Sequence, residues 1–125
     1  MNSSVWLIGL GGFIGSVSRY WVQQYFLRLV PGAFPLGTFV VNVLGCLLIG
    51  LLLGLFERHT ALPAPWRLFL TTGFCGGFTT FSTFAYESVV LGRTGELLLL
   101  ALYAAGSLLV GMLAAFVGVW AARLG

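Results

Sequence analysis

The sequence predicts an all-α membrane protein in which four helices cross the bilayer. Of its 125 residues, 59% are hydrophobic and only 7% are charged. A soluble domain of this length cannot hide that much apolar surface. Two stretches, 39–56 and 97–122, contain no charged residue, and each is at least as long as the roughly 17–25 residues that a spanning helix needs. Membrane lipid is therefore the expected surroundings of the chain.

Turn residues and charges divide the chain into four apolar segments. The connectors read "RLVPGAFP", "ERHTALPAPWR" and "GRTGE", and none is long enough to hold a second domain. The first segment lacks a basic leader and an obvious small-residue cleavage site, so we expect a retained helix rather than a signal peptide. We expect one domain over residues 1–125, with helices at approximately 4–27, 34–56, 68–91 and 97–122.

Few residues suit catalysis or metal binding. Cys46 and Cys75 lie within expected spans, where unpaired buried thiols are ordinary, so we predict neither a disulfide nor a thiolate metal site. The stretch "GLGGFIG" (9–15) approaches a dinucleotide-binding fingerprint, but the spacing needs a glycine where Ile14 stands, and no strand precedes it. We therefore expect no enzyme activity and no nucleic-acid partner.

The charges of the connectors bear on orientation. Four spans place both termini on one side of the membrane. That side collects three arginines and the opposite side two: Arg58, Arg67 and Arg123 against Arg28 and Arg93. The positive-inside rule needs a clear excess, so we expect insertion in both orientations and an antiparallel, dual-topology homodimer with its two-fold axis in the membrane plane. The alternative is a single topology set by the weak bias or by a partner protein.

Polar side chains inside apolar spans are candidates for function, because burying them in lipid is costly. Arg19 and Glu87 are the charges well inside spans, although each lies toward a helix end, where snorkelling or pairing would also satisfy it. Asn42 offers two N–H donors suited to an anion, or bonds a neighbouring helix. Tyr103 and Ser107, spaced i and i+4, share one helix face. Together these residues predict a polar track.

The stretch "GFCGGFTTFSTF" (73–84) interrupts the third span with polar and flexible residues. Two adjacent glycines followed by β-branched Thr79 and Thr80 weaken the helix, which predicts a break in the middle of the membrane. Carbonyls released there suit a bare cation. The positive ring edges of Phe81 and Phe84 suit a small anion. The alternative is a glycine-rich helix crossing with core aromatics.

Three stretches resemble the signature motifs of the Fluc family of fluoride channels, also called CrcB proteins: "GGFIGSVSRY" (11–20), "GTFVVNVLGCLLIG" (37–50) and "GFCGGFTTFSTF" (73–84). The resemblance covers essentially the whole chain. It implies a homodimer in the cytoplasmic membrane with two fluoride pores and a structural Na⁺ at its centre. The implied function is passive fluoride efflux, which protects the cell against fluoride toxicity.

The resemblance also implies roles for individual residues. Backbone carbonyls of Gly76 and Thr79, from both subunits, would hold the sodium ion. Phe81 and Phe84 would line the pores, and Asn42 would meet fluoride. Further positions match pore-side polar residues and a vestibule arginine: Tyr103, Ser107, Ser82 and Thr83 for the former, and Arg19 for the latter.

The sequence departs from the family pattern in two places. Ser16 replaces the usual alanine of the first motif, a small-for-small change that puts little in doubt. Gly111 stands where some members carry another serine, so the polar track along the last helix is expected to be shorter.

Two other functions compete with a fluoride channel. Small dual-topology proton-coupled multidrug antiporters also use four helices, but they resemble one another in a carboxylate within the first helix. Here that helix carries Arg19 and no acid, so proton coupling would fall on Glu87. The third possibility is a non-conducting membrane subunit whose glycines only mediate assembly.

Overall fold

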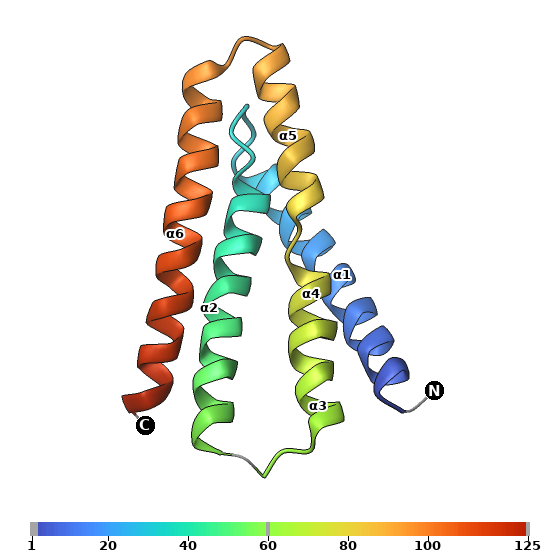
Figure 1. Cartoon of the computed structure of the whole chain (residues 1–125). Helices are drawn as coiled ribbons and strands as arrows, with labels where there is room; N and C mark the ends of the chain where they lie inside the picture. Colours follow the sequence, from blue (N-terminus) through green and yellow to red (C-terminus); the bar gives the residue numbers. More distant parts are fainter. Residues whose placement is uncertain (1–2, 60, 125) are drawn as a thin grey trace.

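The structure is a computed structural model that describes residues 3–59 and 61–124, and every regular element within them is helical. The segments α3, η1 and α4 follow one another without a gap, so these residues form four long helical segments (Figure 1). This confirms the predicted all-α class with four helices. The elements are α1 (Ser3–Leu29), α2 (Leu36–Arg58), α3 (Ala64–Leu68), the π-helix η1 (Phe69–Cys75), α4 (Gly76–Phe78), α5 (Phe81–Arg93) and α6 (Leu97–Leu124).

The four segments run alternately up and down. Figure 1 shows the start of α1, the connection from α2 to α3 and the end of α6 at one end of the bundle, with the connection from α5 to α6 at the other. That last connection is tight because Gly95 adopts a positive φ of 80°, which glycine tolerates without strain. The amide of Glu96 then donates to the carbonyl of Leu91 at 2.9 Å, closing α5 with a Schellman-type turn.

Glycines let α2 and α6 pack backbone against backbone. A methyl group at Gly50 would overlap the carbonyl of Ala115, and one at Gly118 would overlap the carbonyl of Leu47. Such close contact between helices is typical of membrane proteins, where dispersion and shape replace the hydrophobic effect as the driving force. The two helices therefore form one tightly packed pair.

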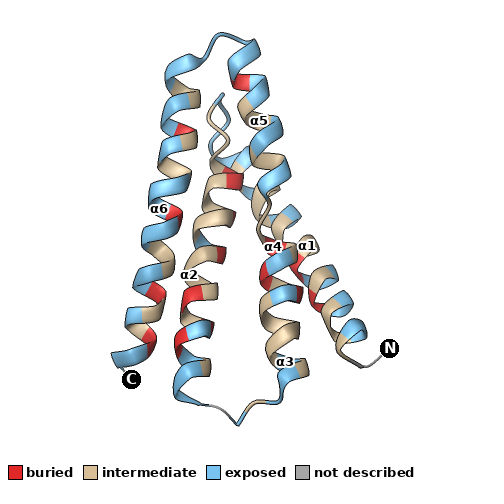
Figure 2. Cartoon of the chain, viewed as in Figure 1, coloured by how far each residue is buried: buried red, intermediate tan, exposed pale blue. Residues whose placement is uncertain are grey.

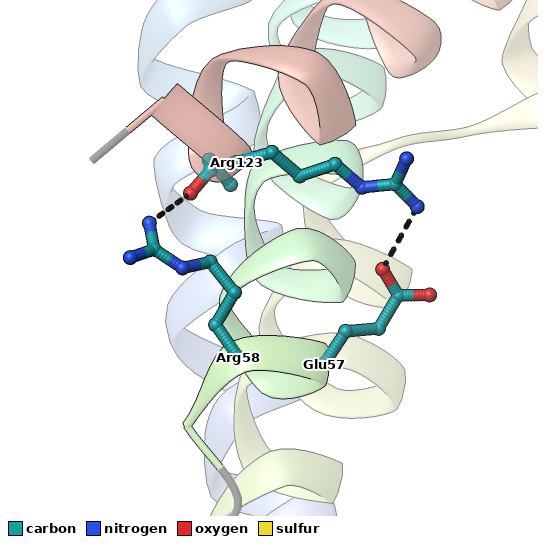
Figure 3. A network of polar contacts seen from close by, with 4 residues as sticks. Glu57, Arg58 and Arg123 are labelled. Carbon is teal, nitrogen blue, oxygen red and sulfur yellow. Dashed lines mark hydrogen bonds and ion pairs between the residues drawn. The ribbon is translucent and has the colours of Figure 1, made fainter.

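Polar contacts join the same two helices at their ends (Figure 3). Arg58 donates from Nη1 to the carbonyl of Ala122 at 2.8 Å, and Arg123 forms an ion pair with Glu57 at 3.3 Å. Both members of the ion pair are about half exposed or more, so it contributes at most about 1 kcal/mol. The bond from Arg58 satisfies one of the last carbonyls of α6, which have no partner within the helix.

A second close pair is formed by α1 with η1 and α4. A Cβ at Gly11 would lie 2.5 Å from the carbonyl oxygen of Phe69, and a Cβ at Gly77 would lie 2.5 Å from that of Gly12. Gly15 faces the carbonyl of Phe74 just as closely. These glycines hold the third segment directly against α1.

The outer surface of the bundle is strongly apolar. Phe116, Leu113 and Trp120 on α6 are 72%, 62% and 62% exposed, and Figure 2 shows that buried residues are few along every helix. By length and composition α2 and α6 could each cross a membrane. Water would penalise such a surface, whereas lipid does not. The surface is that of a membrane protein.

From the packing of α6, we expect substitution of two of its glycines by alanine to change the stability of the protein by different amounts. Gly118→Ala should destabilise the protein by roughly 1–3 kcal/mol, because the new methyl group meets the backbone of Leu47 and Leu51, which cannot move aside easily. Gly106→Ala is the matched control, since its Cβ meets only the ring of Phe39 at an ordinary 3.7 Å. Thermal unfolding in detergent measures both, and equal stability of the two variants would contradict the packing described here.

Candidate functional site

The third helical segment is interrupted at two threonines. Thr79 and Thr80 are extended, with φ and ψ of −87° and 160° and of −153° and 119°. Gly76 and Gly77, where the sequence suggests weakness, instead lie within α4. Gly77 stays helical because it packs directly on Gly12 of α1, a contact that its lack of a side chain permits. The interruption therefore begins three residues after the start of the glycine pair.

Thr80 restarts the helix. Its Oγ1 accepts a hydrogen bond from the amide of Thr83 at 3.1 Å, which makes it the N-cap of α5. This is the usual role of a threonine at such a position. The same hydroxyl donates to Oγ1 of Thr83 at 3.1 Å and lies 3.4 Å from Oγ of Ser82. The predicted hydroxyl residues of α5 thus cluster on its first turn.

Asn42 on α2 bonds both backbone polar groups of Thr80. Its Nδ2 donates to the carbonyl of Thr80 at 3.1 Å, and its Oδ1 accepts from the amide of Thr80 at 2.8 Å. The side-chain amide thereby takes the place of helical partners at the interruption. Since Nδ2 carries two hydrogens, one of them is left for a ligand.

The interruption withdraws the carbonyls of Gly76 and Thr79 from the helical hydrogen-bond ladder. In a continuous helix the amide of Thr80 would donate to the carbonyl of Gly76, and the amide of Thr83 to that of Thr79. Here the first amide donates to Asn42 and the second to the hydroxyl of Thr80. These are the two carbonyls that the family resemblance assigns to sodium. Carbonyl oxygens are suitable ligands for a small hard cation, so their chemistry fits such an ion.

Arg19 of α1 bonds the third segment just before the interruption. Its Nε donates to the carbonyl of Gly77 at 3.0 Å, and the side chain is half-buried. The contact follows from the glycine face of α1, because Gly15 lies four residues earlier and brings the two backbones together. The arginine that the sequence places at a vestibule is therefore bonded to the interrupted segment.

A cavity of about 460 Å³ lies between α2, the interrupted segment and α6. Ser107 projects a buried Oγ that has no hydrogen-bond partner within residues 3–59 and 61–124. A buried hydroxyl without a partner is costly, so this position suits a polar ligand or water. The cavity brings together most of the predicted site residues: Asn42, Gly76, Thr79, Thr80, Phe81, Phe84 and Ser107.

The two phenylalanines of α5 differ sharply in exposure. Phe81 is 78% exposed, whereas Phe84 is half-buried and lies 4.9 Å, ring centre to ring centre, from Tyr103. The rings of Phe81 and Phe84 are 5.7 Å apart and tilted by 41°. Packing within this chain therefore explains why Phe84 is a large aromatic residue, but it does not explain Phe81. The Phe81 ring lies at the mouth of the cavity, and the described part of the chain leaves most of it uncovered.

A second polar group surrounds Glu87. One carboxylate oxygen accepts from the hydroxyl of Tyr103 at 2.8 Å and the other from Thr38 at 3.1 Å, and Thr38 accepts in turn from Gln23 at 3.0 Å. The four residues come from α1, α2, α5 and α6. Tyr103 and Thr38 are almost fully buried, at 0% and 2% exposure. This network joins all four helical segments.

The predicted residues thus form two neighbouring groups. Thr83 and Glu87 line a second cavity of about 430 Å³, and the contact between Phe84 and Tyr103 connects it to the first group. Sequence reasoning missed Thr38, which donates to Glu87, and Gln23, which donates to Thr38. Spacing carried a signal for both, since Thr38 precedes Asn42 by four residues and Gln23 follows Arg19 by four, which places each pair on one helix face.

Comparison with known proteins gives a consistent result. Residues 6–119 match the family described as "CrcB-like protein, Camphor Resistance (CrcB)". A protein of Nitratidesulfovibrio vulgaris is 49% identical over 118 residues, covering 94% of this chain and 95% of its own length. A protein of Chlorobaculum tepidum is 50% identical over 121 residues, covering 97% and 95%. Both relatives bear the name "Fluoride-specific ion channel FluC".

The double contact of Asn42 predicts a local weakness when it is removed. Asn42→Leu keeps a similar volume but leaves both backbone groups of Thr80 without this partner, so it should destabilise the fold by about 1–3 kcal/mol and speed amide exchange in residues 79–84. Ser88→Ala is the control, because Ser88 bonds a carbonyl within its own helix, that of Phe84, and its loss should change stability by less than about 0.5 kcal/mol. Unchanged exchange at residues 79–84 in Asn42→Leu would show that the contact is unimportant.

Proposed function

Because the chain belongs to the CrcB family, we propose that it is a fluoride-specific ion channel for passive fluoride efflux. The observation that carries this proposal is sequence similarity. Over nearly its full length, the chain is about 50% identical to proteins named fluoride-specific ion channels. Fluoride enters cells as the neutral acid and ionises inside. A channel then lets the anion leave along its electrochemical gradient, which protects the cell against fluoride toxicity and requires no catalysis.

The chemistry of the cavity supports an anion path. Asn42 retains one N–H donor, and Ser107 offers a hydroxyl without a partner in the described part of the chain. Phe81 and Phe84 border the same space, and their ring edges carry partial positive charge. A small, hard anion is stabilised by such N–H, O–H and C–H donors without a cation that would trap it. The hydroxyls of Ser82 and Thr83, and Tyr103 beyond them, extend this path.

A second copy of the chain is the proposed cover for the cavity mouth. Phe81 exposes most of its ring there, and the face beside it includes the interrupted segment. The near balance of connector arginines supports an antiparallel, dual-topology homodimer in which two copies meet in opposite orientations. We propose that all four segments cross the cytoplasmic membrane and that the interruption at Thr79 and Thr80 lies within its thickness.

A structural sodium ion is the proposed partner of the carbonyls that leave the helical ladder. Gly76 and Thr79 both line the cavity, and the amides that would pair with their carbonyls in a continuous helix are used elsewhere. Supplied by two copies, these oxygens would hold the ion at their junction. When bound, the cation supplies a positive charge that lowers the cost of holding an anion nearby in a low dielectric.

Fluoride efflux from liposomes containing the purified protein tests this function. Phe81→Ile should lower the efflux rate by about tenfold, because it keeps the bulk but loses a ring-edge interaction on the order of 1.4 kcal/mol. Phe116→Ile is the control, since Phe116 is 72% exposed on α6 but lies outside the cavity. Chloride efflux, and efflux driven by a pH gradient, are recorded in parallel. Proton-coupled exchange would favour an antiporter, and no flux at all a non-conducting subunit.

Connector charge should control orientation and activity together. Without added charge, cysteine-accessibility labelling should find each connector on both sides of the membrane. Adding two or three lysines to residues 92–96 should force one orientation, because the positive-inside rule then has a clear excess to act on. Fluoride efflux should fall and should recover when a copy with the opposite bias is co-expressed. A single orientation above ~90% in the unmodified protein would rule out the antiparallel assembly.

A further inference from the structure

The geometry points to Arg19 as a positioning residue that maintains the interruption of the third helix. We infer that its Nε–H, rather than its positive charge as such, holds the carbonyl of Gly77 in place at 3.0 Å. The inference concerns the site of the proposed function. Only the fluoride-efflux part of its test rests on that function.

The carbonyl of Gly77 needs a partner because of the interruption. In a continuous helix it would accept from the amide of Phe81, four residues on. The extended Thr79 and Thr80 make Phe81 the first residue of a new helix instead. A backbone carbonyl without a partner is costly in surroundings that exclude water. Nε–H of Arg19 supplies the missing donor.

The position of Arg19 is set by backbone contacts on both sides of the bond. Gly12 and Gly77 touch directly, and the backbone at Gly15 meets those of Phe74, Gly77 and Phe78. Arg19 lies one turn beyond Gly15 on the same face of α1, so its side chain crosses to the third segment over a short path. The donor is thus held by the closest helix contact at this site and not by a mobile loop.

The interruption is consequently held from two helices. Asn42 of α2 bonds Thr80 on the α5 side of the interruption, and Arg19 of α1 bonds Gly77 on the α4 side. Between them lie Phe78 and Thr79. If either contact is lost, the interrupted segment is less firmly held, and its backbone amides should open to solvent more often.

Two substitutions separate the donor of Arg19 from its charge. In glutamine the Nε2 donor is the same number of bonds from Cα as Nε of arginine, so Arg19→Gln keeps an N–H at the required depth without the charge. Arg19→Met has similar reach and neither property. Amide hydrogen exchange of the full chain in lipid nanodiscs is measured on peptides covering residues 76–84, with peptides of α6 as the internal reference.

The expected result is a clear difference between the two variants. Exchange in residues 76–84 should rise about tenfold or more in Arg19→Met, as the loss of the donor to this carbonyl implies, and should stay within about threefold of the wild type in Arg19→Gln. Fluoride efflux should follow the same order. Arg28→Gln and Arg28→Met, on the exposed end of α1, are the matched controls and should leave both measurements unchanged.

Equal exchange in Arg19→Gln and Arg19→Met would overturn the inference, since it would make the charge decisive or the side chain irrelevant. If Arg19→Met does not yield folded protein, Arg19→Gln decides alone: exchange near the wild type supports the role of the donor, and a tenfold rise refutes it. If the wild-type chain conducts no fluoride, the proposed function fails, but the exchange comparison still decides what Arg19 does.

Discussion

The structure depends on one constraint, which is that backbone N–H and C=O groups must find partners wherever a helix is interrupted away from water. At Thr79 and Thr80 the ladder stops, and side chains from other helices take over. Asn42 pairs with both polar groups of Thr80, while Thr80 itself caps α5. Without these substitutes the interruption would leave backbone polar groups without partners, at a cost in free energy.

Close glycine contacts make those substitutes possible. A polar side chain reaches a backbone group on a neighbouring helix more readily when the two helix axes approach closely. Gly77 on Gly12 provides that approach for α1, and Gly45, where a side chain would overlap that of Thr79, provides it for α2. These glycines therefore serve to let two helix backbones come close together, and not to make the chain flexible. Among the glycines of residues 3–124 that the structure describes, Gly95 is the one with a positive φ, which turns the chain between α5 and α6.

The sequence predicts the helical class and the order of the helices because long apolar segments and short polar connectors determine both. It also directs attention to Asn42 and to the stretch containing Thr80, since polar residues are rare in such segments. The partners of Glu87 and the helical state of Gly76 and Gly77 were not predictable in the same way. They depend on how each helix is rotated, and helices that are apolar on every side give little sign of which face turns inward.

The π-helix η1 has a consequence for which changes the third segment can tolerate. Its seven residues lie directly before α4, and a π-turn accommodates more residues than an α-turn over a similar rise. Any insertion or deletion in the third segment that this π-winding does not absorb would rotate everything that follows by about 100°. Gly77 would turn away from α1, and Thr79 and Thr80 away from their partners. Over evolutionary time this segment can therefore accept substitutions more readily than insertions or deletions, so its length is a stricter requirement than the identity of most of its side chains.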